Sequence, residues 1–233
     1  MSQNVFKWKH FESDIIMVCV RWYLKYPLSY RMLVEMIEER GLNLAHTTIM
    51  RWVHQYSPII SDRVRKHLRP TNDSWRMDET YLKIKGKNAY LYRAVDSAGN
   101  TIDFFVSEHR DKDAAKKFFK KALKAIHNQH PRVITTDKYA ATEIAIHEMI
   151  YSGTLSVGTT LRKVQYLNNI IEQDHRFIKR KVKLKLGFGN FETAEKTICG
   201  IETMHMIRKG QVEEIQRVLS EVEFINKIMG IVA

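Results

Sequence analysis

The chain has 233 residues, of which 44% are hydrophobic, and its 38 Lys or Arg against 26 Asp or Glu give a formal net charge of +12. This composition excludes wholesale disorder, and the charge exceeds what solubility requires, so it indicates a polyanionic partner, either nucleic acid or an acidic membrane surface. The longest early apolar run, residues 15–20, is too short to span a bilayer, and Cys19 and Cys199 lack zinc-site spacing. We expect a cytoplasmic protein that binds nucleic acid.

Three helices are predicted near the start of the chain. The first covers residues 11–26, the second runs from Ser29 to about Arg40, and the third spans residues 45–56, with Pro58 just beyond its end. Two short helices joined by a turn near a glycine are typical of a helix-turn-helix.

The third of these helices has the pattern of a DNA-recognition helix. Its apolar residues can pack inward, which leaves four polar side chains facing out: Thr47, Thr48, Arg51 and Gln55. Such side chains suit base edges and phosphates. On this pattern alone, an ordinary helical hairpin with a solvated face remains an alternative.

A basic segment, residues 57–74, is predicted to be a helix or a linker, and its part over 61–74 is taken as the linker between domains. Three strands follow at 75–85, 89–96 and 100–107, and the turn residues between them predict an antiparallel meander. The remaining elements alternate. They are a helix over 111–128 with an apolar stripe that ends at Ile126, a short apolar strand over 133–136, a helix over 139–151, a weak strand at 155–161, and helices over 167–185, 191–209 and 212–229.

This order predicts an α/β fold, a mixed sheet with flanking helices, preceded by an all-α helix-turn-helix domain. The expected domains are residues 1–60, the linker 61–74, a catalytic domain over 75–190, and C-terminal helices over 191–233. The last of these could pack on the same chain or support oligomerisation. In the ribonuclease-H-like arrangement of such a sheet, the first and fourth strands are neighbours.

Three acidic residues then become candidates for one metal site. Asp78 lies in the first strand, Asp137 follows the fourth, and Glu172 lies on a basic helix. Three carboxylates can hold two Mg²⁺ ions about 3.5–4 Å apart, as in enzymes that cut and join phosphodiesters. Other acids are expected to be structural or solvated, with Glu79 on the opposite side of its strand: Glu79, Asp96, Asp103 and Asp174.

The Glu172 helix carries cations on the same face. Asn169, Glu172, Arg176 and Lys179 share one stripe at steps of three and four residues, so Arg176 and Lys179 could hold DNA phosphates beside the ions. The alternative for this stripe alone is an intrahelical Glu172–Arg176 ion pair of about 0.3–0.5 kcal/mol.

Several segments together carry a family resemblance: residues 46–53, 77–81 (Met-Asp-Glu-Thr-Tyr), 90–96, 136–138 and 166–175. Over about residues 5–210 the chain resembles DDE transposases of bacterial insertion sequences, in the insertion-sequence-six family. Lys179 occupies a position where this class keeps a basic residue. One departure is visible, because the family usually has a proline shortly after the second aspartate and residues 138–142 contain none.

The resemblance implies a retroviral-integrase-like catalytic core with Asp78, Asp137 and Glu172 as catalytic residues and ligands of two Mg²⁺ ions, for which Mn²⁺ could substitute. It implies double-stranded DNA partners, both the element's terminal inverted repeats and target DNA, and a homodimer or higher oligomer at the bacterial nucleoid. It also implies strand cleavage, 3′-hydroxyl strand transfer and replicative, cointegrate-forming transposition. The alternatives are a non-catalytic helix-turn-helix regulator and a nuclease of the same fold without strand transfer.

Overall fold

The computed structural model describes residues 5–7, 9–137, 139–164, 169–184, 188–215 and 217–231. Of the motif residues, Lys138 and residues 166–168 lie outside these ranges, as does the side chain of Asn169. The chain divides into two compact units, one made of Met1–Leu68 with Lys183–Ala233 and the other of Arg69–Val182. None of the described helices combines the length and apolar character that a membrane crossing needs.

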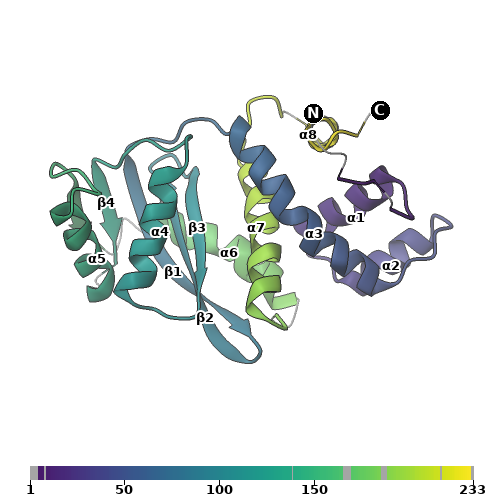
Figure 1. The fold of residues 1–233 in the computed structure, drawn as a ribbon, viewed down its shortest axis with the longest axis horizontal. Coiled ribbons are helices and arrows are strands. Elements are labelled where there is room, and N and C mark those ends of the chain that lie inside the picture. The colour runs from purple at the N-terminus through teal and green to yellow at the C-terminus, as the bar shows by residue number, and fades with distance from the viewer. Residues whose placement is uncertain are drawn as a thin grey trace. The chain divides into compact units, whose positions relative to one another are not determined.

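The first unit is helical (Figure 1). Its elements are α1 (Ser13–Lys25), α2 (Tyr30–Glu38), α3 (His46–Val64), the 3₁₀ helix η1 (Arg65–His67), α7 (Phe191–Arg208) and α8 (Val218–Met229). The Ser29 hydroxyl accepts a hydrogen bond from the Met32 amide and so caps α2. Gly41, at φ +77°, follows that helix, where a left-handed residue suits glycine.

Helix α3 is longer than predicted, because it passes through Pro58 and continues to Val64. Proline inside a helix costs about 3 kcal/mol, since it removes one backbone hydrogen bond and crowds the preceding turn. The added residues, about two turns, bury Ile60 and Val64 completely, and each such burial contributes about 1.5–3 kcal/mol. Burial therefore outweighs the proline, and residues 61–64 are helical, one of the two alternatives for this basic segment.

Helix α7 packs closely on α3. At Gly200, an added Cβ would lie 2.6 Å from the Ser57 hydroxyl and 2.7 Å from the Leu24 methyl groups, so this approach requires glycine. Helix α8 begins at Val218 rather than 212, because Gly210 ends α7 at φ +74° and Val212 instead forms a β-bridge with Leu68.

Helix α8 packs on its own chain through charged as well as apolar contacts. Glu221 pairs with Arg21 at 3.7 Å and with Lys25 at 2.7 Å, and Arg63 donates to the Ile228 carbonyl at 2.6 Å. The last contact satisfies a carbonyl at the C-terminal end of α8 that has no partner within the helix.

The second unit is a five-stranded mixed sheet with helices on both faces. It contains β1 (Ser74–Ile84), β2 (Lys87–Asp96), β3 (Thr101–Ser107), α4 (Lys112–Lys124), β4 (Val133–Thr136), α5 (Ala140–Tyr151), β5 (Thr160–Lys163) and most of α6 (Asn169–Leu184). The strand order is β3-β2-β1-β4-β5. The first three strands are antiparallel, whereas β4 is parallel to both β1 and β5, so the predicted neighbourhood of β1 and β4 is confirmed.

The β1–β2 hairpin has a two-residue loop, with Ile84 opposite Lys87. Lys85 and Gly86 both adopt positive φ, at 50° and 75°, as a type I′ turn demands. The predicted meander of three strands is therefore present, with this turn one residue earlier than the expected Gly-Lys-Asn.

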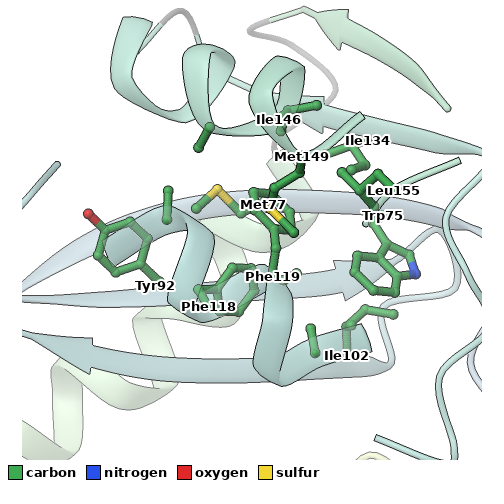
Figure 2. Packing of buried hydrophobic residues seen from close by; sticks show 14 of the residues in the cluster. Trp75, Met77, Tyr92, Ile102, Phe118, Phe119, Ile134, Ile146, Met149 and Leu155 are labelled. Carbon is green, nitrogen blue, oxygen red and sulfur yellow. The ribbon is translucent and has the colours of Figure 1, made fainter. Parts of the chain in front are cut away.

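One face of the sheet carries the apolar core. Trp75, Met77 and Tyr92 from the strands pack against Phe118 and Phe119 of α4 and against residues of α5 (Figure 2). Because side chains alternate along a strand, Asp78 and Arg93 lie on the other face, which α6 covers. Figure 1 shows α4 in front of the strands and α6 behind them.

The predicted helix 111–128 ends earlier, at Lys124. Asp111 caps its start by accepting from the Ala114 amide. At its end, the Asn128 amide group donates to the carbonyls of Ala122 and Ile102, at 2.9 and 3.1 Å, and so turns the chain back toward β3. Ile126, predicted to be the last residue of the apolar stripe, is therefore fully exposed at 102%.

Candidate active site

Asp78 and Asp137 meet at the place where pairing between β1 and β4 stops. The register of the two strands ends with Arg76 opposite Thr135, so β1 has an open edge beyond that point. Asp78 lies on this open stretch, and Asp137 directly follows β4. Carboxylate oxygens of Asp78, Asp137 and Glu79 all lie within 4.8 Å of one another, a set named here the acid cluster.

Asp78 is held by α6. Its side chain is 19% exposed, and its Oδ2 lies 3.2 Å from His175 Nε2. The Nδ1 atom of the same imidazole lies 3.4 Å from Nη1 of the buried Arg93, which stands opposite Asp78 in the β1–β2 register. Helical spacing predicts that His175 packs inward, and it is buried, but this spacing gives no sign of its contact with Asp78.

Asp137 is held at the start of α5. The Tyr139 amide donates to Asp137 Oδ1 at 3.1 Å, and the positive end of the helix dipole favours a carboxylate there. A proline at position 139 could not donate this bond. The segment without the family's usual proline thus supplies a donor to the second aspartate. The Asp137 side chain remains 40% exposed.

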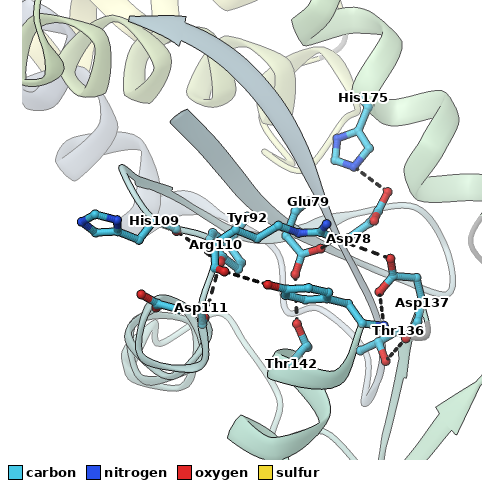
Figure 3. Close-up of polar contacts among 11 residues, drawn as sticks. Asp78, Glu79, Tyr92, His109, Arg110, Asp111, Thr136, Asp137, Thr142 and His175 are labelled. Atoms are coloured by element: carbon cyan, nitrogen blue, oxygen red, sulfur yellow. Dashed lines mark hydrogen bonds and ion pairs between the residues drawn. The ribbon is translucent and has the colours of Figure 1, made fainter. Parts of the chain in front are cut away.

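Glu79 was expected to point away from Asp78, yet one of its oxygens belongs to the acid cluster. Its side chain is only 2% exposed and accepts hydrogen bonds from Arg110 Nη2 at 3.1 Å and from the Thr142 hydroxyl at 2.9 Å. Burial raises the pKa of the Glu79 carboxyl, while these two donors act to lower it. Because β1 has an open edge here, neighbouring side chains of opposite faces can meet around it (Figure 3).

Arg110 brings a positive charge to the acid cluster. Its Nη2 lies 3.7 Å from Asp137 Oδ2, and its guanidinium lies over the Tyr139 ring at 3.8 Å. Although burial opposes it, the hydrogen bond and charge of Glu79 raise the pKa of Arg110, which therefore stays charged. Arg110 lies in a loop with no motif, so the sequence offered no signal for it.

Glu172 lies in the first turn of α6 and is exposed. It is not a member of the acid cluster found among the described residues, and within them its carboxylate makes no hydrogen bond or ion pair. On a helix, however, it stands about 60° round the axis and about 4.5 Å along it from His175, the residue that contacts Asp78. The alternative for this stripe, a Glu172–Arg176 ion pair, is not found among the described side chains.

Helix α6 is fixed to the sheet unit by a buried charge pair. Arg93 Nη2 lies 2.6 Å from Asp174 Oδ2, and the arginine is fully buried. The inward face of α6 consists of four buried residues at helical spacing: Ile171, His175, Ile178 and Val182. Arg176 and Lys179 are exposed on the stripe next to it.

The predicted recognition residues lie on α3. Arg51 and Gln55 are exposed and Thr47 and Thr48 are half-buried, while Ile49, Trp52, Val53 and Tyr56 pack inward as expected. Gln55 accepts a hydrogen bond from Lys9 at 3.0 Å. The DNA-contacting roles of these side chains stay predictions.

The other acids have structural partners. Asp96 accepts from the amides of Ala98 and Asn100 in the β2–β3 turn, Asp103 pairs with Lys121 at 3.3 Å, and Asp174 pairs with Arg93. These three predictions are confirmed.

The donor chemistry of the acid cluster fits a hard divalent cation. Its groups within 4.8 Å are all carboxylates, and no thiol competes with their oxygens. Asp78 and Asp137 are partly exposed, so an ion can reach them. Arg110 is 3.7 Å from Asp137, beyond hydrogen-bonding distance, and leaves that carboxylate able to turn to an ion.

Known proteins share this sequence pattern. Residues 72–211 match a family model described as a DDE domain. The chain is 39% identical to the transposase for insertion sequence-like element IS431mec of Staphylococcus aureus, over 91% of this chain and 92% of that protein. It is 38% identical, over the same shares, to the transposase for insertion sequence element IS257 in transposon Tn4003 of Staphylococcus aureus.

Among solved structures, the chain is similar to the HTLV-2 integrase catalytic core domain in complex with magnesium (trimeric form), with 19% identity, a TM-score of 0.45, and coverage of 57% of this chain and 85% of that one. The sheet order found above is itself the ribonuclease-H-like one. With the DDE-domain match over more than half of its length, the chain belongs to the DDE transposases of bacterial insertion sequences, in the insertion-sequence-six family.

Proposed function

We propose that this transposase binds the terminal inverted repeats of its insertion sequence, cuts a DNA strand at each end, and transfers the resulting 3′-hydroxyl to target DNA, so that cointegrates form. Asp78, Asp137 and Glu172 are its catalytic carboxylates. The observation that carries this proposal is the meeting of Asp78 and Asp137 at the open edge of β1, with the Glu172 helix fastened to Asp78 through His175.

The three carboxylates would hold two Mg²⁺ ions, or Mn²⁺ in their place, and such ions activate the attacking oxygen and stabilise the leaving one. The protein's own contribution is to fix these oxygens. Tyr139 and Arg110 hold Asp137, and His175 holds Asp78.

DNA binding would use the surplus of positive charge. The net charge of +12 favours a polyanion, and Arg176 and Lys179 are exposed on the same helix face as Glu172. There they would hold phosphates next to the reacting bond. Thr47, Thr48, Arg51 and Gln55 of α3 would read the inverted repeats. Because two element ends must be joined to one target, the active form is at least a homodimer.

The test is a strand-transfer assay with oligonucleotides carrying the inverted repeat, a target plasmid and Mg²⁺. We expect Asp78→Asn, Asp137→Asn and Glu172→Gln each to bind the end DNA and to lose both cleavage and joining. A variant that keeps near wild-type turnover would remove its residue from the triad. Cleavage without joined products in the wild type would instead indicate the nuclease, and specific binding with neither reaction would indicate the regulator.

A further inference from the structure

We propose that Glu79 and Arg110 are positioning residues that hold Asp137 in place, and that Glu79 is not itself a metal ligand. This inference rests on the proposed function, because it assigns roles within the same site. It decides between two carboxylate sets, since Glu79 and Glu172 compete for the third place beside Asp78 and Asp137.

Both oxygens of Glu79 are already in use. Oε2 accepts from Arg110 and Oε1 accepts from Thr142, and the side chain is 2% exposed. To bind an ion, Glu79 would have to leave a buried, charge-assisted contact, and breaking such a pair is strongly destabilising. Asp78 and Asp137 are more exposed, and Asp137 has no side-chain donor within hydrogen-bonding distance among the described residues.

Arg110 is itself fixed from the Asp137 side. Tyr139 stacks on the guanidinium at 3.8 Å, and its hydroxyl donates to the Arg110 carbonyl at 2.7 Å. The same tyrosine donates its amide to Asp137 at 3.1 Å. Arg110, Tyr139 and Asp137 therefore form a closed ring of contacts, to which Glu79 is joined through Arg110, and these four residues are named the clamp. Figure 3 shows Glu79, Arg110 and Asp137 together.

The clamp also solves an electrostatic problem. Three carboxylates within 4.8 Å repel one another, and without a counter-charge the exposed Asp137 would turn toward solvent. Arg110 compensates the buried Glu79 and keeps a positive charge 3.7 Å from Asp137. Asp137 is thus held near Asp78 yet free to exchange this distant partner for an ion.

The experiment is a Mn²⁺ titration of the full chain without DNA, with free Mn²⁺ followed by its electron paramagnetic resonance signal. Asp137→Asn should abolish Mn²⁺ binding at the acid cluster. Glu79→Gln should weaken the affinity by only about tenfold, as loss of a residue that supports a ligand does. The matched control is Glu148→Gln, which also removes a carboxylate engaged in ion pairs, in this case with Lys112 and Lys116. This variant should leave the Mn²⁺ affinity unchanged.

A double-mutant cycle provides the decisive comparison. If Glu79 acts through Arg110, the variant carrying both Glu79→Gln and Arg110→Gln should bind Mn²⁺ no more weakly than Arg110→Gln alone. If Glu79 is a ligand, Glu79→Gln should weaken Mn²⁺ binding as much as Asp137→Asn does. The losses of affinity from Glu79→Gln and from Arg110→Gln should then add in the double variant. Should Arg110→Gln not fold, Arg110→Lys takes its place, because it keeps the charge without the planar fork.

The outcomes separate this inference from the proposed function. The wild type could bind Mn²⁺, and the double-mutant cycle could give the predicted affinities, while no strand transfer occurs. That result would contradict the proposed function but support the clamp. Strand transfer could instead occur while the losses of Mn²⁺ affinity add in the double variant, or while the wild type binds no Mn²⁺. Either result would contradict the clamp but support the proposed function.

Discussion

Asp137 sits among fixed partners, whereas Glu172 lies on an exposed stripe of α6 with no side-chain hydrogen bond or ion pair within the described residues. One half of the site is therefore preformed by the clamp, and the other depends on a helix laid across the sheet. Preformed ligands lose little entropy when an ion binds, while an exposed glutamate must be ordered first. Under the proposed function, we therefore expect DNA and metal to complete the site mainly on the α6 side.

The largest effect on activity should come from Glu172, on the α6 side of the site. Glu172→Gln should lower the strand-transfer rate by about 10³-fold or more, since the loss of a charged metal ligand costs several kcal/mol of transition-state stabilisation. Thermal unfolding should be unchanged because the side chain is exposed. Glu195→Gln, an exposed glutamate of α7, is the matched control and should keep full activity. Equal rates in the two variants would show that the site is complete without Glu172.

The next largest effect should be a loss of stability when the buried pair that holds α6 on the sheet, Arg93 and Asp174, is broken. Arg93→Met should destabilise the protein by about 3–5 kcal/mol, because it leaves Asp174 without its buried partner. Denaturant unfolding measures this loss. Arg176→Met removes an exposed arginine from the same helix and should cost much less. Similar losses for both would mean that the buried pair does not hold the helix.

A smaller effect is expected from the cations beside Glu172. Replacing Arg176 and Lys179 together with alanine should weaken DNA binding by about tenfold. The slope of log affinity against log salt concentration should become shallower by about one for each phosphate that is no longer neutralised. Lys117 and Lys120 form the matched pair, since both are exposed on α4, on the opposite face of the sheet. An equal loss from the α4 pair would indicate unspecific attraction rather than a DNA path along α6.

The smallest effect should come from Thr142, which donates to Glu79 of the clamp. Thr142→Val keeps the shape of a buried side chain but removes the hydroxyl that donates to Glu79. Stability should fall by about 1 kcal/mol, the net value of one such hydrogen bond. Thr142→Ser retains the donor and should recover most of the loss in the same unfolding measurement. A loss from Thr142→Ser as large as that from Thr142→Val would attribute the effect to the methyl group.

Much of the sheet could be predicted, because its strands alternate and its turns carry recognisable residues. Lys85 and Gly86 form the tight turn close to where glycine indicated one. The local sequence pattern mispredicted the ends of helices where contacts between distant segments determine them. Burial of Ile60 and Val64 carried α3 through Pro58, and Asn128 ended α4 before Ile126 could pack.

The site shows the same division. Asp78 and Asp137 were predictable because strand order brings them together. Glu79 has structural partners, as expected, but alternation along a strand gave no sign that its carboxylate would come within 4.8 Å of Asp78 and Asp137 at the open edge. Arg110 and His175 act through contacts between segments distant in sequence, which periodicity cannot reveal.

The most direct measurement is the anomalous scattering of Mn²⁺ in crystals of the chain bound to the DNA of one element end. We predict manganese peaks coordinated by Asp78, by Asp137 and by Glu172, with Glu79 still paired to Arg110. Manganese coordinated by Glu79, with Glu172 turned away from every ion, would contradict the assignment of the third carboxylate.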